Sequence, residues 1–69
     1  MAKYLLVYDL RITDTDGTAE QSCELTVNCE PDELQRTIAL HKQGIQSKLD
    51  RKLNSGEEGF VLLKQVLPL

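Results

Sequence analysis

The sequence is poor in aromatic residues: it has no tryptophan, one phenylalanine and two tyrosines among 69 residues. Apolar runs are short as well, and none approaches the roughly 20 residues that a membrane-spanning helix needs, which excludes such a span. The single histidine and the absence of a Cys-x-x-Cys spacing argue against a metal site. Residues 1–4 lead directly into a strand-like segment, so we expect no signal peptide.

Net charge is also low, at -3, while 41% of the residues are hydrophobic, and this combination is typical of a globular chain. The length falls below the roughly 100–200 residues of an average domain, so we expect one domain over residues 1–69. A domain this small buries only about 60% of its unfolded surface. Such domains usually depend on disulfides, a metal ion or a partner subunit.

The two cysteines, Cys23 and Cys29, do not provide this stabilisation. They lie six positions apart in one predicted strand, a separation of roughly 20 Å at about 3.3 Å per residue. A disulfide needs Cα atoms within about 7 Å. Two free thiols suit a reducing cytoplasm, where we therefore expect the protein, and a partner remains as the source of stability.

Alternating hydrophobicity predicts a hairpin of two strands. Residues about 3–12 are apolar at every even position from 4 onwards, and residues about 20–29 are apolar at the odd positions from 23. The polar segment between them contains Asp16-Gly17, which is typical of a turn. Pairing Tyr8 with Leu25 places both apolar sets on one face.

A helix is predicted over residues about 31–53, since Pro31 suits a first helical position and apolar residues recur every three or four positions. Gly44 leaves its continuity open. Residues about 59–67 form a last strand, giving a β-β-α-β order. The predicted fold is α+β, a split βαβ-like domain with sheet order 2-1-3 and the helix on one face. The expected helical stripe is Leu34, Ile38, His41, Ile45, Leu49 and Leu53.

One helix can cover only one face of this sheet. The first strand presents Leu5 and Val7 to the other face. The last strand is apolar at both its even and its odd positions, so whichever set faces the helix, the other set stays uncovered. A contiguous apolar patch usually marks an interface. We expect it to bind a second copy or another protein, with Leu5, Val7, Phe60 and Leu62 as anchors. Edge-to-edge pairing of an outer strand is an alternative.

Charge is segregated along the chain, with -6 in residues 1–33 and +3 in residues 34–69. Asp14 and Asp16 can pair with Arg51 and Lys52 at one end of the fold, although such exposed pairs contribute little stability. The alternative is an acidic rim that steers the protein to a basic surface. That rim would consist of Asp14, Asp16, Glu20, Glu57 and Glu58.

No catalytic, cofactor or metal site and no small-molecule substrate is evident. His41 lies on the apolar stripe, where a core-edge histidine is typical, and Cys29 is expected to be a packing thiol rather than a nucleophile activated by the helix dipole. Residues 55–59 carry acids where a phosphate-binding loop needs amides. A small enzyme around His41 with Cys29 ranks third among the hypotheses.

The favoured hypothesis is a small acidic, non-catalytic protein-interaction module, and its size and charge suit an inhibitor or accessory protein of phage or mobile-element type. The alternative is a nucleic-acid-associated module. A pI of 4.9 and the scarcity of aromatic residues disfavour nucleic acid. The only support for a nucleic-acid-associated module is a basic helix face made of Lys42, Lys48, Arg51 and Lys52.

Overall fold

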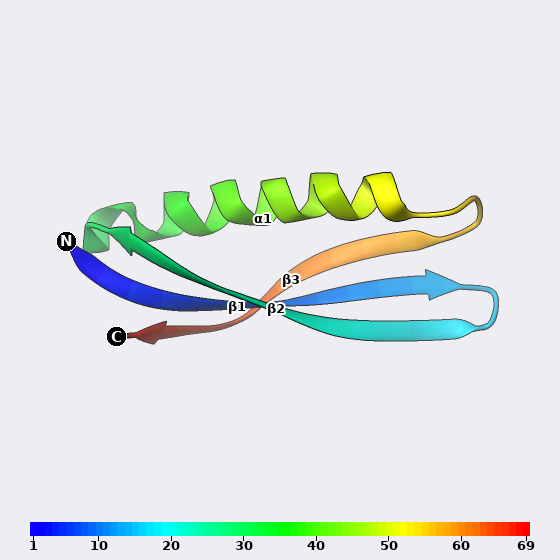
Figure 1. Cartoon of the computed structure of the whole chain (residues 1–69), viewed down its shortest axis with the longest axis horizontal. Coiled ribbons are helices and arrows are strands. Elements are labelled where there is room, and N and C mark those ends of the chain that lie inside the picture. The colour runs from blue at the N-terminus through cyan, green and yellow to red at the C-terminus, as the bar shows by residue number, and fades with distance from the viewer.

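The computed structural model describes all 69 residues and contains a three-stranded sheet and one long helix (Figure 1). The strands are β1 (Ala2–Asp14), β2 (Gly17–Cys29) and β3 (Glu58–Pro68). A short 3-10 turn, η1 (Pro31–Glu33), leads into helix α1 (Leu34–Lys52). The strand order is β2-β1-β3, and β1 is antiparallel to both neighbours. The predicted α+β fold with a central first strand is thereby confirmed.

The hairpin is tighter than its predicted form. Tyr8 pairs with Cys23 rather than with Leu25, a shift of two residues along β2. The strands extend almost to the turn, because the Asp14 carboxylate accepts hydrogen bonds from two backbone amides of the turn at 2.7 and 3.1 Å. Since the shift is even, every apolar side chain keeps its predicted face.

Helix α1 is continuous through Gly44. The predicted start at Pro31 is correct, but the first turn is the 3-10 turn rather than α-helix. Arg51 and Lys52 lie in the last turn, where positive charge complements the helix dipole. The connection to β3 then passes through Gly56, whose φ of +87° is the left-handed conformation that glycine adopts most readily.

Helix and sheet approach each other closely where α1 packs on β3. A Cβ at Gly59 would lie 2.8 Å from Cδ2 of Leu49 and 3.1 Å from Cδ1 of Leu53. Beside this contact, the side-chain amide of Gln46 donates to the carbonyl oxygen of Gly59 at 3.0 Å and accepts from the amide of Val61 at 3.2 Å. One side chain therefore pairs with the outer edge of β3 as a peptide group of a fourth strand would.

The core lies between the helix and one face of the sheet, and only seven of the 69 residues are buried. Leu6 and Tyr8 on the central strand are fully buried. The Tyr8 hydroxyl donates a hydrogen bond to the carbonyl oxygen of Ile38 at 2.8 Å, which links β1 to the helix. The core cluster consists of Leu6, Tyr8, Val27, Cys29, Leu49 and Val61.

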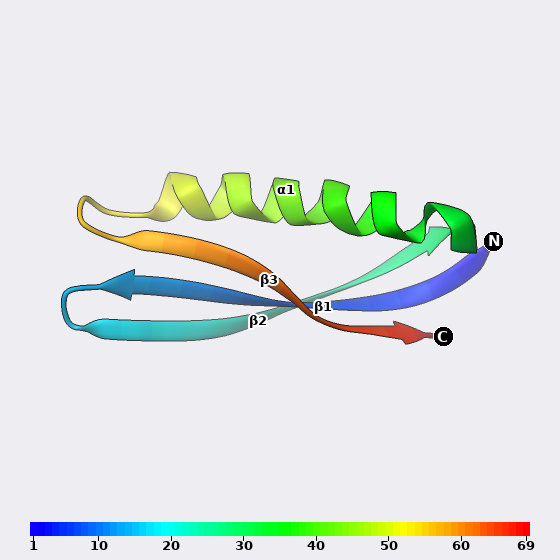
Figure 2. The same ribbon diagram turned by 180° about the vertical axis from the view of Figure 1, so that it is seen from behind.

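The middle of α1 does not take part in this packing. All six residues from 39 to 44 are exposed, whereas Ile38 and Ile45 on either side are half-buried. The strands twist past one another below this part of the helix, so a straight helix touches the sheet mainly towards its two ends (Figures 1 and 2). His41 is consequently exposed, and its predicted position at the core edge is wrong.

The molecule is elongated, with extents of 44 × 17 × 13 Å and a radius of gyration of 13.5 Å. A compact chain of this length would have a radius of gyration of about 11 Å. The accessible surface is 5039 Å², whereas a compact monomer of this mass would expose about 4,400 Å². The isolated chain thus exposes several hundred Å² more than its size requires.

Two glycine substitutions test the helix packing in opposite directions. Gly59→Ala should lower the free energy of unfolding by about 1–3 kcal/mol, because the new methyl group meets the packed Leu49 side chain. Gly44→Ala should raise it by about 0.5–1 kcal/mol, since nothing lies within 4 Å and alanine favours helix. Urea denaturation of both variants measures the two effects, and equal shifts would contradict the close contact.

The Tyr8 hydroxyl gives the fold a specific sensitivity to alkali. Burial first, and then the nearby Cys23 thiolate, raise the pKa of Tyr8 above its ordinary 10.0. The unfolded chain therefore loses this proton before the folded chain does. The stability contributed by neutral Tyr8 is complete below pH 10 and falls as the pH rises through the raised folded pKa.

Tyr8→Phe should remove this alkaline dependence. At neutral pH the variant should be about 1 kcal/mol less stable, because the Ile38 carbonyl loses its hydroxyl donor. Above pH about 10, its free energy of unfolding should fall less steeply than that of the wild type. Urea denaturation across this pH range, combined with tyrosinate absorbance, makes the comparison. Parallel curves for the two proteins would contradict the assignment to Tyr8.

Candidate protein-binding surface

The face of the sheet opposite α1 is uncovered, and β3 contributes most of its apolar side chains. Phe60 pairs with Arg11 and Leu62 with Asp9, while Val61 between them belongs to the core. In this part of β3 the odd-numbered residues therefore face the helix and the even-numbered residues face away from it. Phe60 and Leu62 lie on the open face, where they are 50% and 42% exposed.

A β-bulge in β3 changes that alternation further along the strand. The pairing of β1 with β3 shifts register between Val7 and Tyr8, which leaves Lys64 as an extra, unpaired residue. Beyond the bulge Leu67 pairs with Leu5, so Leu67 also lies on the open face. Sequence periodicity missed Leu67 because it assumes an uninterrupted strand, and no glycine or asparagine marks the bulge.

The four predicted anchors differ in how much surface they offer. Leu5 is half-buried, Phe60 and Leu62 are exposed, and Val7 is only 8% exposed and presents little contact area. Single exposed leucines are common on proteins, but adjacent ones on a single strand are not. Five of the seven large apolar side chains that are most exposed lie in residues 60–69: Phe60, Leu62, Leu63, Leu67 and Leu69. Of these, Leu63 pairs with Tyr8 and lies on the helix side of the sheet.

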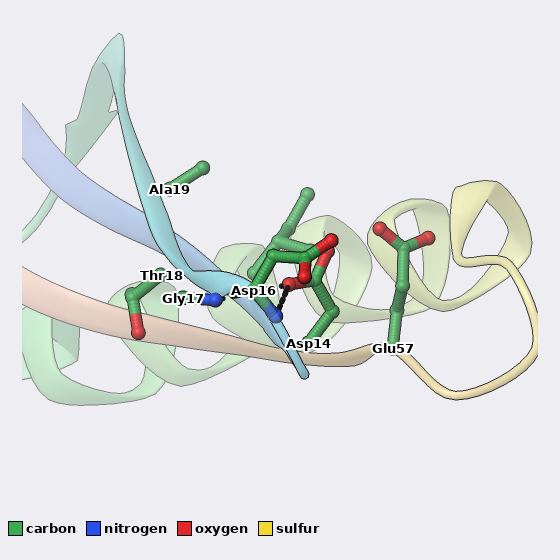
Figure 3. A pocket seen from close by; sticks show the side chains of 7 residues that line it. Asp14, Asp16, Gly17, Thr18, Ala19 and Glu57 are labelled. Carbon is green, nitrogen blue, oxygen red and sulfur yellow. Dashed lines mark hydrogen bonds between the residues drawn. The ribbon is translucent and has the colours of Figure 1, made fainter.

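Three of the predicted rim acids gather beside the hairpin turn. Asp14 and Asp16 from the turn and Glu57 from the segment before β3 line one open pocket of about 340 Å³ (Figure 3). The Glu57 carboxylate also accepts a hydrogen bond from the amide of Asn54 at 2.6 Å. No set of side chains here is arranged to hold a metal ion. The cluster is therefore an acidic end of the molecule rather than a cation site.

The other two rim acids lie outside this pocket. Glu20 on β2 is 3.5 Å from the guanidinium of Arg11, which also contacts Asp9 at 3.0 Å. Glu58 is exposed at the start of β3, opposite Thr13. The structure thus brings Asp14, Asp16 and Glu57 together and leaves Glu20 and Glu58 separate.

The expected ion pairs between the hairpin turn and the end of α1 do not form. No carboxylate of Asp14 or Asp16 lies within 4.0 Å of Arg51 or Lys52, although the hairpin turn and the end of α1 share one end of the molecule (Figure 1). For Asp14 the reason is local, because its carboxylate accepts hydrogen bonds from the amides of its own turn.

The basic residues of α1 do not form a single face. Lys42 and Arg51 are nine positions apart, which is two and a half turns, so they lie on opposite sides of the helix. Lys48 and Lys52 are one turn apart and border a groove between the helix and the hairpin. This spread weakens the case for a nucleic-acid surface, because a phosphate backbone is bound by a continuous basic stripe.

The residues of the third-ranked enzyme hypothesis lie in different surroundings. His41 is exposed on the unpacked middle of α1, whereas Cys29 is 7% exposed in the core. Cys23 is half-buried, and both thiols are free.

Comparison with known proteins gave no match to a family model, a curated protein or a solved structure. No helix of the structure has both the length and the hydropathy that crossing a bilayer demands. The function is therefore inferred from the surfaces themselves.

Substitution of two aspartates in the hairpin turn distinguishes the loss of hydrogen bonds from the loss of one negative charge. Asp14→Ala should lower the free energy of unfolding by about 1 kcal/mol, because two turn amides lose their acceptor. Asp16→Ala should change it by less than about 0.5 kcal/mol, since only the backbone of Asp16 takes part in the turn. Both variants lose one negative charge, so equal unfolding energies in urea would show that charge, not the turn, matters.

Proposed function

We propose that this chain is a non-catalytic protein-interaction module that binds another protein through the open face of its sheet. The observation that carries the proposal is the placement of Phe60, Leu62 and Leu67 on one face of β3, where Leu67 pairs with Leu5 and no other element covers them. A standard interface buries about 800 Å² on each partner. The elongated chain exposes several hundred Å² more than a compact monomer of its mass, so it has surface available for an interface.

Charge supports a partner with a basic border around an apolar patch. The chain carries a net charge of -3, and Asp14, Asp16 and Glu57 concentrate negative charge at the hairpin end. Complementary charge around an interface accelerates association and selects among partners. A protein that covered the open face with apolar side chains and met this end with lysine or arginine would satisfy both features.

A homodimer is the other form of this proposal, because a second copy offers the same apolar face. A small acidic domain that masks a surface of its partner would act as an inhibitor or accessory protein, of the kind that phages and mobile elements encode. The two free thiols suit a reducing compartment such as the cytoplasm.

A charge placed on the open face should abolish this association. Leu62→Glu replaces an exposed side chain on the open face, so it should weaken binding at least tenfold, with a change in unfolding free energy below about 1 kcal/mol. Leu40→Glu is the matched control, because Leu40 is 60% exposed on the unpacked middle of α1. Sedimentation over a range of concentrations reports self-association, and cross-linking in the host cell reports another partner.

Association that persists unchanged in Leu62→Glu, or that is lost equally in Leu40→Glu, would refute the open face as the binding surface. Binding to an oligonucleotide at low salt that falls steeply as salt rises would instead support the nucleic-acid alternative. Lys48→Ala should then reduce that binding, whereas Leu62→Glu should not.

A further inference from the structure

The outer edge of β2 carries backbone groups that have no partner. In an antiparallel sheet, the amide and carbonyl of one residue point to the same side, and consecutive residues alternate. The amide of Leu69 donates to the carbonyl oxygen of Lys3 at 2.8 Å, so the odd-numbered residues of β1 face β3. The even-numbered ones face the odd-numbered residues of β2. The even-numbered residues of β2, from Thr18 to Asn28, therefore direct their backbone groups outwards.

The two edges of the sheet are protected very differently. Gln46 occupies the edge of β3 at Gly59 and Val61, the bulge at Lys64 interrupts it, and Pro68 has no amide hydrogen to offer. Such devices prevent a strand from adding to an edge. β2 has none of them, since its 13 residues contain no proline and pair with β1 without a register shift. It is a regular edge to which another strand can add.

A groove runs beside this edge on the helix side of the sheet. It has a volume of about 340 Å³ and lies between α1 and the hairpin. Its floor includes Leu10, Ile12 and the half-buried Cys23, and Ile45 of the helix forms part of its wall. At the hairpin end of the molecule α1 lies beside β3, and β2 is the strand farthest from the helix (Figure 1). The groove, which is lined there by residues 21–23 of β2, remains open towards that strand. A strand added at β2 would place alternate side chains in it.

Charge differs between the two faces that such a strand would meet. Lys48 and Lys52 border the groove, and neither has an acidic partner within 4.0 Å. On the opposite face, Glu24 is exposed without an ion-pair partner, and Glu20 forms an ion pair with Arg11. The side chains of an added strand would thus meet positive charge on one face and negative charge on the other.

We propose that the β2 edge binds an extended segment of another protein as a fourth strand. The residues of this segment that face the groove are apolar with one acid, which pairs with Lys48 or Lys52. The alternate residues, which lie beside Glu20 and Glu24, are basic. This mode of recognition takes its affinity from main-chain hydrogen bonds and its specificity from alternate side chains. It uses a different surface from the open face, so each can fail without the other.

The test uses a synthetic peptide with this pattern, acetyl-Lys-Val-Arg-Val-Lys-Glu-Thr-amide, added to the full chain. The outward amides of Ser22, Glu24 and Thr26 should exchange rapidly with solvent in the free protein and become protected when the peptide binds. Amide exchange followed by NMR reports each position. A peptide of the same composition in scrambled order and one methylated at its backbone nitrogens should bind at least roughly tenfold more weakly.

Two sets of variants provide matched controls. Ser22→Pro removes an outward amide but none that pairs with β1, so the hairpin should persist while peptide binding falls roughly tenfold. Ser22→Ala should bind as the wild type does. Lys48→Glu should weaken binding of the peptide, and binding should recover when the glutamate of the peptide is replaced by lysine. Leu62→Glu should leave peptide binding unchanged.

Three results would overturn the proposal. The first is binding of the methylated or scrambled peptide as tightly as the designed one, which would show that no strand ladder forms. The second is unchanged binding in both Ser22→Pro and Lys48→Glu. The third is protection of the β2 amides that grows with protein concentration alone, which would identify a second copy of the chain as the occupant of this edge.

Discussion

The close docking of α1 onto β3 sets the layout of this molecule. The absence of a side chain at Gly59 lets Leu49 and Leu53 approach the strand, and Gln46 then fixes the helix to the edge of β3 through two backbone hydrogen bonds. In the half of the sheet nearer the hairpin turn, a helix held against β3 does not also cover β2, whereas at the other end of the sheet the start of α1 lies beside the end of β2 (Figure 1). The contact that closes β3 therefore leaves the first part of the β2 edge and the groove beside it open.

The size of the core follows from this arrangement. Helix and sheet meet mainly towards the two ends of α1, so the buried cluster is small and depends on polar contacts that position the helix, such as the bond from Tyr8 to Ile38. Burying that hydroxyl is tolerable only because it has an acceptor. Apolar residues that the helix cannot reach remain at the surface, and β3 carries most of them.

Sequence periodicity was sufficient for the fold because β1, β2 and α1 each have one dominant period. Alternation in β1 and β2 and the stripe of α1 predict the elements, and short connections restrict their order. Three features depended on local geometry that periodicity does not report. The hairpin register follows from the Asp14 carboxylate, the position of Leu67 from the bulge at Lys64, and the exposure of His41 from sheet twist. The apolar character of the open face was predictable, whereas the membership of Leu67 was not.

The open face and the β2 edge are adjacent parts of one sheet, so a strand bound at the edge changes the surroundings of the open face. A strand added at β2 would widen the open face by one strand and place its basic side chains next to Glu24. The local negative charge would fall, while β2 and β1 would still separate the added strand from the apolar side chains of β3. Occupation of the edge would therefore change the charge that a partner on the open face meets without blocking the apolar side chains that hold it.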